Sequence, residues 1–218
     1  SWTGEAGVYF RLYEANNSSF TGQTQVYGGI GSSKAFSGKS NGSYYYRVQA
    51  CNPANTSACS NYLDGSGAVE VTIAPAVPGS ITVPSAYDND GAYTISWTGE
   101  SGAFFKLYES TNSDFSGQTL VYSGTSLSKA FSGKTNGSYY YRVRACNAVN
   151  TTSCSGYRSG ANPVQVTQPP AAPTGISVPS GYDNDGAYTV SWTGEAGAYF
   201  RLYEANNSAF SGQTQVYG

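Results

Sequence analysis

Residues 138–147 have the sequence SYYYRVRACN, and residues 43–52, 95 positions earlier, have the sequence SYYYRVQACN. In the second stretch, one set of alternate residues is Tyr139, Tyr141, Val143 and Ala145, and the other is Tyr140, Arg142 and Arg144. The first stretch has the same alternation, with Gln49 in place of the last arginine. This is the period of a β-strand that has one apolar and one polar face. It is the strongest strand signal in the chain, and it occurs twice, which indicates a repeated β unit.

The same offset relates the whole chain to itself, because tryptophans and cysteines coincide after the shift. The coincident positions are Trp2, Trp97 and Trp192, then Cys51 and Cys146, then Cys59 and Cys154. One fixed period indicates tandem copies of a single folded unit. We predict a partial unit at 1–75 that lacks its first strand, a complete unit at 76–169, and a partial unit at 170–218 with only the first three or four strands. Residues 1–28 and 191–218 differ at only three positions, so we expect a longer parent array.

The composition excludes several classes of function. The net charge is -2 and only 11% of residues are charged, so we expect no nucleic-acid partner, which would need a basic surface. Apolar runs are only a few residues long, far short of the roughly 20 that span a bilayer, so we expect no membrane insertion. Histidine is absent, which removes the commonest general base and transition-metal ligand. We expect no cofactor.

The four cysteines form two identical pairs, Cys51 with Cys59 and Cys146 with Cys154, each with seven residues between. A zinc site usually has ligands roughly two to four residues apart, in two such pairs. Disulfides fit the spacing better, and each would stabilise its unit by roughly 2 to 3 kcal/mol. Disulfides persist in oxidising compartments, so we predict an extracellular or cell-surface protein.

Several shorter strands are expected in the middle unit. Residues 81–83, 93–97 and 104–109 alternate in polarity, and residues 120–122 and 128–131 are briefer candidates between glycine, serine and threonine turns. About seven short strands per unit, with turn signals every 8 to 12 residues or so and no helical period, predict an antiparallel sandwich. The predicted fold class is all-β, with tandem seven-stranded β-sandwiches repeated every 95 residues.

Two of these strands resemble those of a fibronectin type III or immunoglobulin-like domain. Residues 93–97, YTISW, are similar to the second strand with its core tryptophan. Residues 139–145 are similar to the sixth strand, with Tyr139 at the corner-tyrosine position. The resemblance covers the whole chain, and the added cysteines are similar to units of large secreted bacterial surface proteins. No cysteine pair joins the second and sixth strands, which departs from antibody domains. The resemblance implies a scaffold and not an activity.

The resemblance also implies that the sixth strand lies beside the third, which would gather tyrosine and cationic side chains on one outer face. Such side chains form cation–π pairs and are enriched where proteins bind one another. The alternative is that aromatic cross-strand pairs only stabilise an exposed sheet. The predicted contact face comprises Tyr9, Arg11, Tyr13, Tyr45, Arg47, Phe104, Lys106, Tyr108, Tyr140, Arg142 and Arg144.

A short acidic motif, Asp-Asn-Asp-Gly, occurs at Asp88 and Asp90 and again at Asp183 and Asp185. These residue types favour a tight turn. The alternative is a weak calcium site, because alternating side-chain oxygens suit a hard cation. The residues that follow supply no further glutamate of the kind that an EF-hand loop requires.

The remaining recurrent carboxylates are Glu5, Glu14, Glu100, Glu109, Glu195 and Glu204. A glycosidase needs two carboxylates in one cleft, and a small repeated sandwich offers no evident cleft. We therefore expect no enzyme activity and no catalytic residue.

The sequence thus predicts a structural or adhesive extracellular protein whose stacked sandwiches form a stalk or filament. Its expected partners are other copies of the repeat or chain, with surface glycans as a second class. The alternative function is a polysaccharide-binding accessory module, or a plain spacer, of a larger secreted enzyme.

Overall fold

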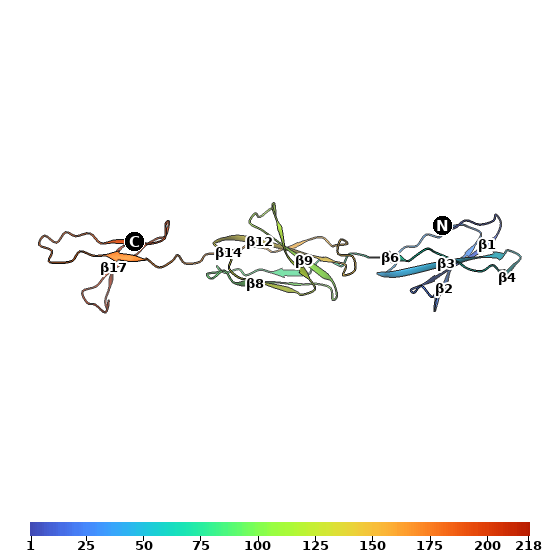
Figure 1. Ribbon diagram of the computed structural model, residues 1–218, viewed down its shortest axis with the longest axis horizontal. Coiled ribbons are helices and arrows are strands. Elements are labelled where there is room, and N and C mark those ends of the chain that lie inside the picture. The colour runs from blue at the N-terminus through green and yellow to red at the C-terminus, as the bar shows by residue number, and fades with distance from the viewer.

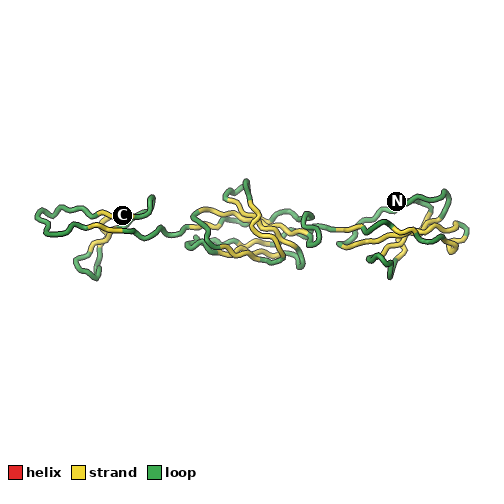
Figure 2. Tube along the Cα trace, viewed as in Figure 1, coloured by secondary structure: helices red, strands yellow, loops and turns green.

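The computed structural model describes all residues, 1–218, as strands and loops without a helix (Figure 2). The predicted all-β class is confirmed. Three bodies follow one another along the long axis, from the blue N-terminal body to the orange C-terminal one (Figure 1). No helix of this structure is both long and apolar enough to cross a membrane.

The middle body is a sandwich of two antiparallel sheets. One sheet has the order β10-β9-β12-β13, with β14 also paired to β12, and the other has the order β11-β8-β7. Its strands are β7 (Ser80–Thr82), β8 (Tyr93–Thr98), β9 (Phe104–Ser110), β10 (Thr119–Gly124), β11 (Ser128–Phe131), β12 (Gly137–Cys146), β13 (Arg158–Ser159) and β14 (Val164–Val166). The YTISW segment lies in β8, the second strand, and the segment at 139–145 lies in β12, the sixth. The expected neighbours β9 and β12 are paired.

The inner faces of the two sheets form one hydrophobic core. Alternate residues of β8, β9 and β12 point inward because successive side chains of a strand lie on opposite faces. The buried cluster consists of Tyr93, Ile95, Trp97, Ala103, Phe105, Leu107, Tyr141, Val143, Ala145, Val164 and Val166. Within this core, the ring centroid of Trp97 lies 6.1 Å from that of Phe105 and 5.6 Å from that of Tyr122.

The middle body has eight strand segments instead of the expected seven, because the final strand is interrupted. Both β13 and β14 pair with β12, and the residues between them include Gly160 and Pro163. Proline lacks the N–H that a sheet ladder needs, and glycine weakens a strand interior. The interruption therefore follows from the local sequence.

The N-terminal body is one sheet, with the order β2-β1-β3-β4 and with β5 and β6 also paired to β3. Its strands are β1 (Tyr9–Ala15), β2 (Thr24–Gly29), β3 (Gly42–Asn52), β4 (Asn55–Cys59), β5 (Leu63–Asp64) and β6 (Val69–Val71). Strands β1, β2 and β3 begin 95 residues before β9, β10 and β12. Only the first strand was expected to be missing, yet residues 33–36, equivalent to β11, also form no strand. The segment that pairs with β11 in the middle body is β8, and its counterpart here, residues 1–3, forms no strand.

The C-terminal body has four strands in two separate pairs. These are β15 (Gly175–Ser177) with β16 (Ser191–Thr193), and β17 (Leu202–Glu204) with β18 (Thr214–Tyr217). Many of its apolar side chains are exposed. Ile176 and Phe210, for example, are exposed.

Candidate functional site

Strand pairing brings the residues of the predicted contact face together in the middle body. In the β9–β12 register, Tyr108 lies opposite Arg142, and Lys106 lies opposite Arg144. All eleven predicted residues are half-buried, the six in the middle body and the five in the N-terminal body. The β9–β12 and β1–β3 pairings bring these residues side by side, and their role as a contact surface stays a prediction.

Arg142 is held between two aromatic rings. Its guanidinium carbon lies 4.6 Å from the ring centroid of Phe115 and 4.0 Å from that of Tyr157. Its Nε donates a hydrogen bond of 2.7 Å to Oε1 of Gln118. The cation is thus in cation–π contact with two rings, and its Nε is hydrogen bonded within its own body.

Arg144 continues the stack along β12. Its Nη2 donates to the hydroxyl of Tyr108 at 2.8 Å, and its guanidinium carbon lies 5.2 Å from the ring centroid of Tyr157. The Tyr108 and Tyr157 rings meet edge to face, with centroids 5.6 Å apart. Cation–π pairs of this kind contribute roughly 0.5 to 1 kcal/mol each at exposed sites, so the face stiffens the sheet.

The N-terminal body repeats the arrangement around Arg47. Its guanidinium carbon lies 4.5 Å from the ring of Phe20 and 3.9 Å from that of Tyr62, and its Nε donates to Oε1 of Gln23 at 2.5 Å. Tyr13 and Tyr62 meet edge to face at 5.5 Å. Because the same cluster forms in both bodies, it is a property of the repeat.

Sequence reasoning missed the phenylalanine beneath each arginine. Phe115 and Phe20 have φ of 64° and 55°, a conformation that bulky side chains rarely adopt. Their loops share the pattern Phe-Ser/Thr-Gly-Gln, which also supplies the glutamine that accepts from arginine. Recurrence of this pattern at every copy, including Phe210, was the signal that could have identified it. In this conformation the rings of Phe115 and Phe20 lie against the guanidinium groups of Arg142 and Arg47.

A second cluster lies at the edge of the middle core and was also missed. Lys134 Nζ contacts both carboxylate oxygens of Glu109 at 2.7 Å. Tyr141 donates to Glu109 Oε2 at 2.5 Å, and the hydroxyls of Tyr141 and Tyr93 are 2.7 Å apart. This Lys-Glu-Tyr network joins the turn before β12 to strands β8, β9 and β12.

The network has a shorter counterpart around Glu14. Lys39 Nζ contacts its two oxygens at 2.6 and 2.5 Å, and Tyr46 donates to Oε2 at 2.8 Å. Burial, followed by the hydrogen bond to the glutamate, raises the pKa of Tyr46 and of Tyr141 well above the ordinary value. Burial likewise raises the pKa of Tyr93.

These shifts predict a loss of stability in alkali. A tyrosine in the unfolded chain ionises near pH 10, whereas Tyr141 and Tyr93 keep their protons in the fold. Their stabilisation is complete below pH 10 and is lost as the pH rises from there toward the folded-state pKa values. We expect the free energy of unfolding to fall by about 1.4 kcal/mol per pH unit for each such tyrosine above pH 10 or so. Denaturant titrations at increasing pH measure this slope, which Tyr93→Phe should reduce; a flat profile would contradict it.

The paired aspartates serve the backbone of their turns. Asp88 Oδ1 accepts from the N–H of Gly91 at 2.6 Å, and Asp183 Oδ1 accepts from Asp185 and Gly186 at 3.0 Å. The backbone hydrogen bond from Asp185 lowers the pKa of Asp183. These are the contacts of the turn interpretation, and no group of three or more histidine, cysteine or acidic side chains could hold a metal ion.

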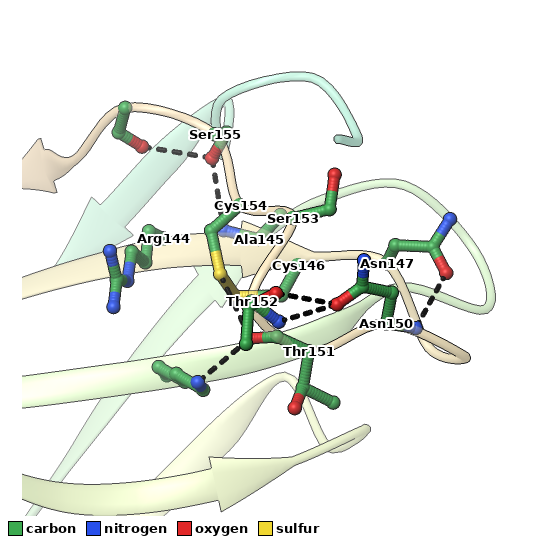
Figure 3. Close-up of a disulfide and its surroundings, with 12 residues drawn as sticks. Arg144, Ala145, Cys146, Asn147, Asn150, Thr151, Thr152, Ser153, Cys154 and Ser155 are labelled. Carbon is green, nitrogen blue, oxygen red and sulfur yellow. Dashed lines mark hydrogen bonds between the residues drawn. A yellow bond between two sulfur atoms is a disulfide. The ribbon is translucent and has the colours of Figure 1, made fainter. Parts of the chain in front are cut away.

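Both predicted disulfides are confirmed, Cys51–Cys59 and Cys146–Cys154. Each closes a hairpin that begins where the long strand of its body ends. Figure 3 shows the second hairpin, with the side chains of Asn147 and Asn150 near the disulfide. These asparagines were not among the predicted site residues.

Four of the six recurrent glutamates have structural contacts. Glu109 and Glu14 form the networks described above, and Glu100 and Glu195 accept from linker N–H groups of Ala76 and Ala171, at 3.4 and 2.9 Å. These contacts position backbone and cations and do not form a pair of carboxylates across a cleft.

No family model and no curated protein matches this chain. Three solved structures are similar to parts of it. Domains from titin match with 16% identity and a TM-score of 0.40, over 58% of this chain and 41% of that one. The FN1–FN3 domains of chicken CNTN1 match with 13% identity and a TM-score of 0.35, over 72% and 56%. A marsupial T cell receptor matches with 14% identity and a TM-score of 0.42, over 81% and 70%. The chain thus spans less than two thirds of the first two structures.

Proposed function

We propose that this chain is a structural or adhesive extracellular protein, in which β-sandwich copies are held end to end as a stalk or filament. The observation that carries the proposal is the linear order of the three bodies (Figure 1). Each body meets the next through its end, and short proline-containing linkers favour an extended, semi-rigid path. Other copies of the repeat are the proposed partners.

The first linker is anchored to the body that it enters. The Gly79 N–H donates to the Thr98 carbonyl at 3.0 Å, and Arg158 Nε donates to the carbonyl of Pro78 at 2.9 Å. Pro78 itself is fully buried. A linker fixed in this way transmits orientation from one body to the next, as a stalk requires.

Backbone hydrogen bonds between the entering and the leaving segments of the middle body suit it to resist tension. The segment at Asp88 runs parallel to β14 and forms a bridge with Val166. The Asp88 N–H donates to the Gln165 carbonyl at 2.8 Å, and the Thr167 N–H donates to the Asp88 carbonyl at 2.7 Å. The Asp88 segment follows the entering strand and β14 precedes the exit. Pulling the ends apart therefore loads both bonds together, in shear along the strands.

The location outside the cell is supported by the disulfides. Both cystines are complete and no cysteine is free. Such bonds persist in secreted and surface proteins and are rare in reducing compartments.

Force spectroscopy on the full chain tests the structural role. We expect the middle body to unfold in one resolvable step, and the step to lengthen by about 25 Å after reduction, when the residues between Cys146 and Cys154 become extensible. Extension without a force peak would contradict a mechanical role.

The alternative function is polysaccharide binding through tyrosine. A glycan array distinguishes this function from the structural role. Tyr157 and Tyr62 are the exposed rings of the aromatic clusters, at 37% and 41% exposure. Tyr108 and Tyr13 lie beside them and already contact arginine or glutamine of their own body. Binding to one polysaccharide that is lost in both Tyr108→Ala and Tyr13→Ala would favour the accessory-module function instead.

A further inference from the structure

The disulfide hairpin of the middle body contacts the chain that leaves the N-terminal body. Asn147 Nδ2 donates to the carbonyl of Ile73 at 3.2 Å, and Asn150 Nδ2 donates to Oγ1 of Thr72 at 3.0 Å. Ser153 Oγ donates to the carbonyl of Thr72 at 2.8 Å. All three donors lie inside the loop that the disulfide closes, so one hairpin binds the two residues that follow β6.

The segment between the two bodies is held by both of them. The Ile73 N–H donates to Oδ1 of Asn41, in the N-terminal body, at 2.5 Å, while the Ile73 carbonyl accepts from the hairpin of the middle body. At the far end of the segment, Pro78 is fully buried. The middle body therefore contacts the segment where it begins and where it ends.

The two asparagines of the hairpin are oriented by its own backbone. Asn147 Oδ1 accepts from the N–H groups of Val149 and Asn150 at 2.9 and 3.1 Å. Asn150 Oδ1 accepts from the N–H and the hydroxyl of Thr152 at 3.2 and 2.6 Å (Figure 3). Because each amide oxygen is bound inside the hairpin, each amide nitrogen is directed toward the exiting segment.

The hairpin has few backbone bonds of its own. The Asn147 N–H donates to the Ser153 carbonyl at 2.8 Å, and the Ser153 N–H donates to the Asn150 carbonyl at 3.0 Å. The pairing with β12 is a single bridge between the two cysteines, whereas the hairpin of the N-terminal body forms strand β4. The Cys146–Cys154 bond therefore closes a hairpin that has no paired strand to hold it.

The hairpin is separate from the hydrophobic core. The buried cluster of the middle body has no member between Ala145 and Val164. Opening the hairpin should therefore leave the two sheets packed and release only the segment at Thr72 and Ile73.

The residues of this contact recur 95 positions apart in the sequence. Both hairpins have the pattern Cys-Asn-x-x-Asn-Thr-x-x-Cys, and Thr167 follows β14 as Thr72 follows β6. Ser153 is the exception, because position 58 is alanine. Both sides of the contact thus belong to the repeat.

We propose that the disulfide hairpin is the joint that fixes the middle body on the body before it, and that the joint depends on the Cys146–Cys154 bond. This rests on the proposed function, because a stalk needs neighbours of fixed orientation. The hairpin binds two main-chain carbonyls and one threonine hydroxyl, so it recognises an exit segment that begins with threonine. Bodies joined by a linker move relative to one another unless an interface holds them, so loss of the disulfide turns the joint into a hinge.

Residual dipolar couplings of the backbone amides, measured on the full chain, test the proposal because they report the orientation of each body separately. We expect one alignment tensor to fit the N-terminal and middle bodies of the unsubstituted chain. In Cys146→Ala with Cys154→Ala, the alignment of the N-terminal body should fall to about half that of the middle body or less, since the two bodies reorient independently. Hydrogen exchange in β8 and β12 should remain as slow as in the unsubstituted chain.

A second variant, Asn147→Asp with Ser153→Ala, keeps the disulfide and removes the two donors to main-chain carbonyls. Aspartate retains the oxygen that accepts from the turn, so the hairpin stays closed while the joint opens. It should show the same separation of alignment as the cysteine variant. The matched controls are Cys51→Ala with Cys59→Ala, and Asn52→Asp, because Asn52 is exposed and its hairpin makes no hydrogen bond to another body. Both controls should keep one shared tensor.

Separate tensors in the unsubstituted chain, or one shared tensor in either variant of the second hairpin, would overturn the proposal. Equal loosening in the controls would do the same. Faster exchange in β8 and β12 of the cysteine variant would also overturn it, because the disulfide would then support the sandwich and not the joint. The force peak of the middle body arises from its core and from the bonds at Asp88, so failure here would leave the proposed structural role standing.

Discussion

Trp97→Ala should unfold the middle body far more readily, with a loss of about 3 to 5 kcal/mol in its free energy of unfolding. Trp97 is 3% exposed and contacts Phe105 of the facing sheet and Tyr122. Removing the indole leaves a cavity between the two sheets, which cannot close without moving strands that are paired at both edges. Its Nε1 has no hydrogen-bond partner, so no polar bond is lost with it.

The repeat supplies a matched control for this substitution. Trp2 occupies the equivalent position in the N-terminal body, but it is only half-buried because that body has a single sheet. Trp2→Ala should therefore cost about 1 to 2 kcal/mol, the transfer term without a large cavity. Hydrogen exchange measured by mass spectrometry can report β9 and β12 separately from β1 and β3. Equal losses of unfolding free energy in Trp97→Ala and Trp2→Ala would show that covering by the second sheet does not increase the contribution of the tryptophan to stability.

The strands of the middle body were predictable because their side chains alternate. The period of two in residues 93–97 and 138–147 fixes which face is apolar, and β8 and β12 follow from it. The disulfides were also predictable from a pattern in the sequence, because the spacing of each cysteine pair does not suit a zinc site. Once β9 and β12 are neighbours, Tyr108 must lie near Arg142 on the outer face.

The contacts made by turns and junctions were not predictable in this way. Lys134 lies 25 residues from Glu109 and reaches it only because the turn before β12 folds over the sheet edge. Phe115 has a positive φ, which bulky side chains disfavour, so residue propensities do not predict a phenylalanine in this conformation. Asn147 meets Ile73 across two bodies, and no periodicity within one copy encodes their relative orientation. Such contacts depend on tertiary geometry, and only their recurrence at 95 residues could draw attention to them.

Glu109→Ala should be the most damaging polar substitution, with a loss of about 3 kcal/mol. Its side chain is 13% exposed and accepts from both Lys134 and Tyr141. Truncation leaves a largely buried ammonium group and a buried hydroxyl without their acceptor, and that desolvation is what the fold loses. If so, Lys134→Ala should restore part of the stability when added to Glu109→Ala, because the unpaired cation is then absent.

The control is Glu100→Ala, which loses one hydrogen bond of 3.4 Å from the Ala76 N–H and should change stability by less than about 0.5 kcal/mol. Denaturant unfolding of the unsubstituted chain, of Glu109→Ala, of Lys134→Ala and of the double variant measures the coupling. Strictly additive losses would show that Glu109 and Lys134 act independently of each other.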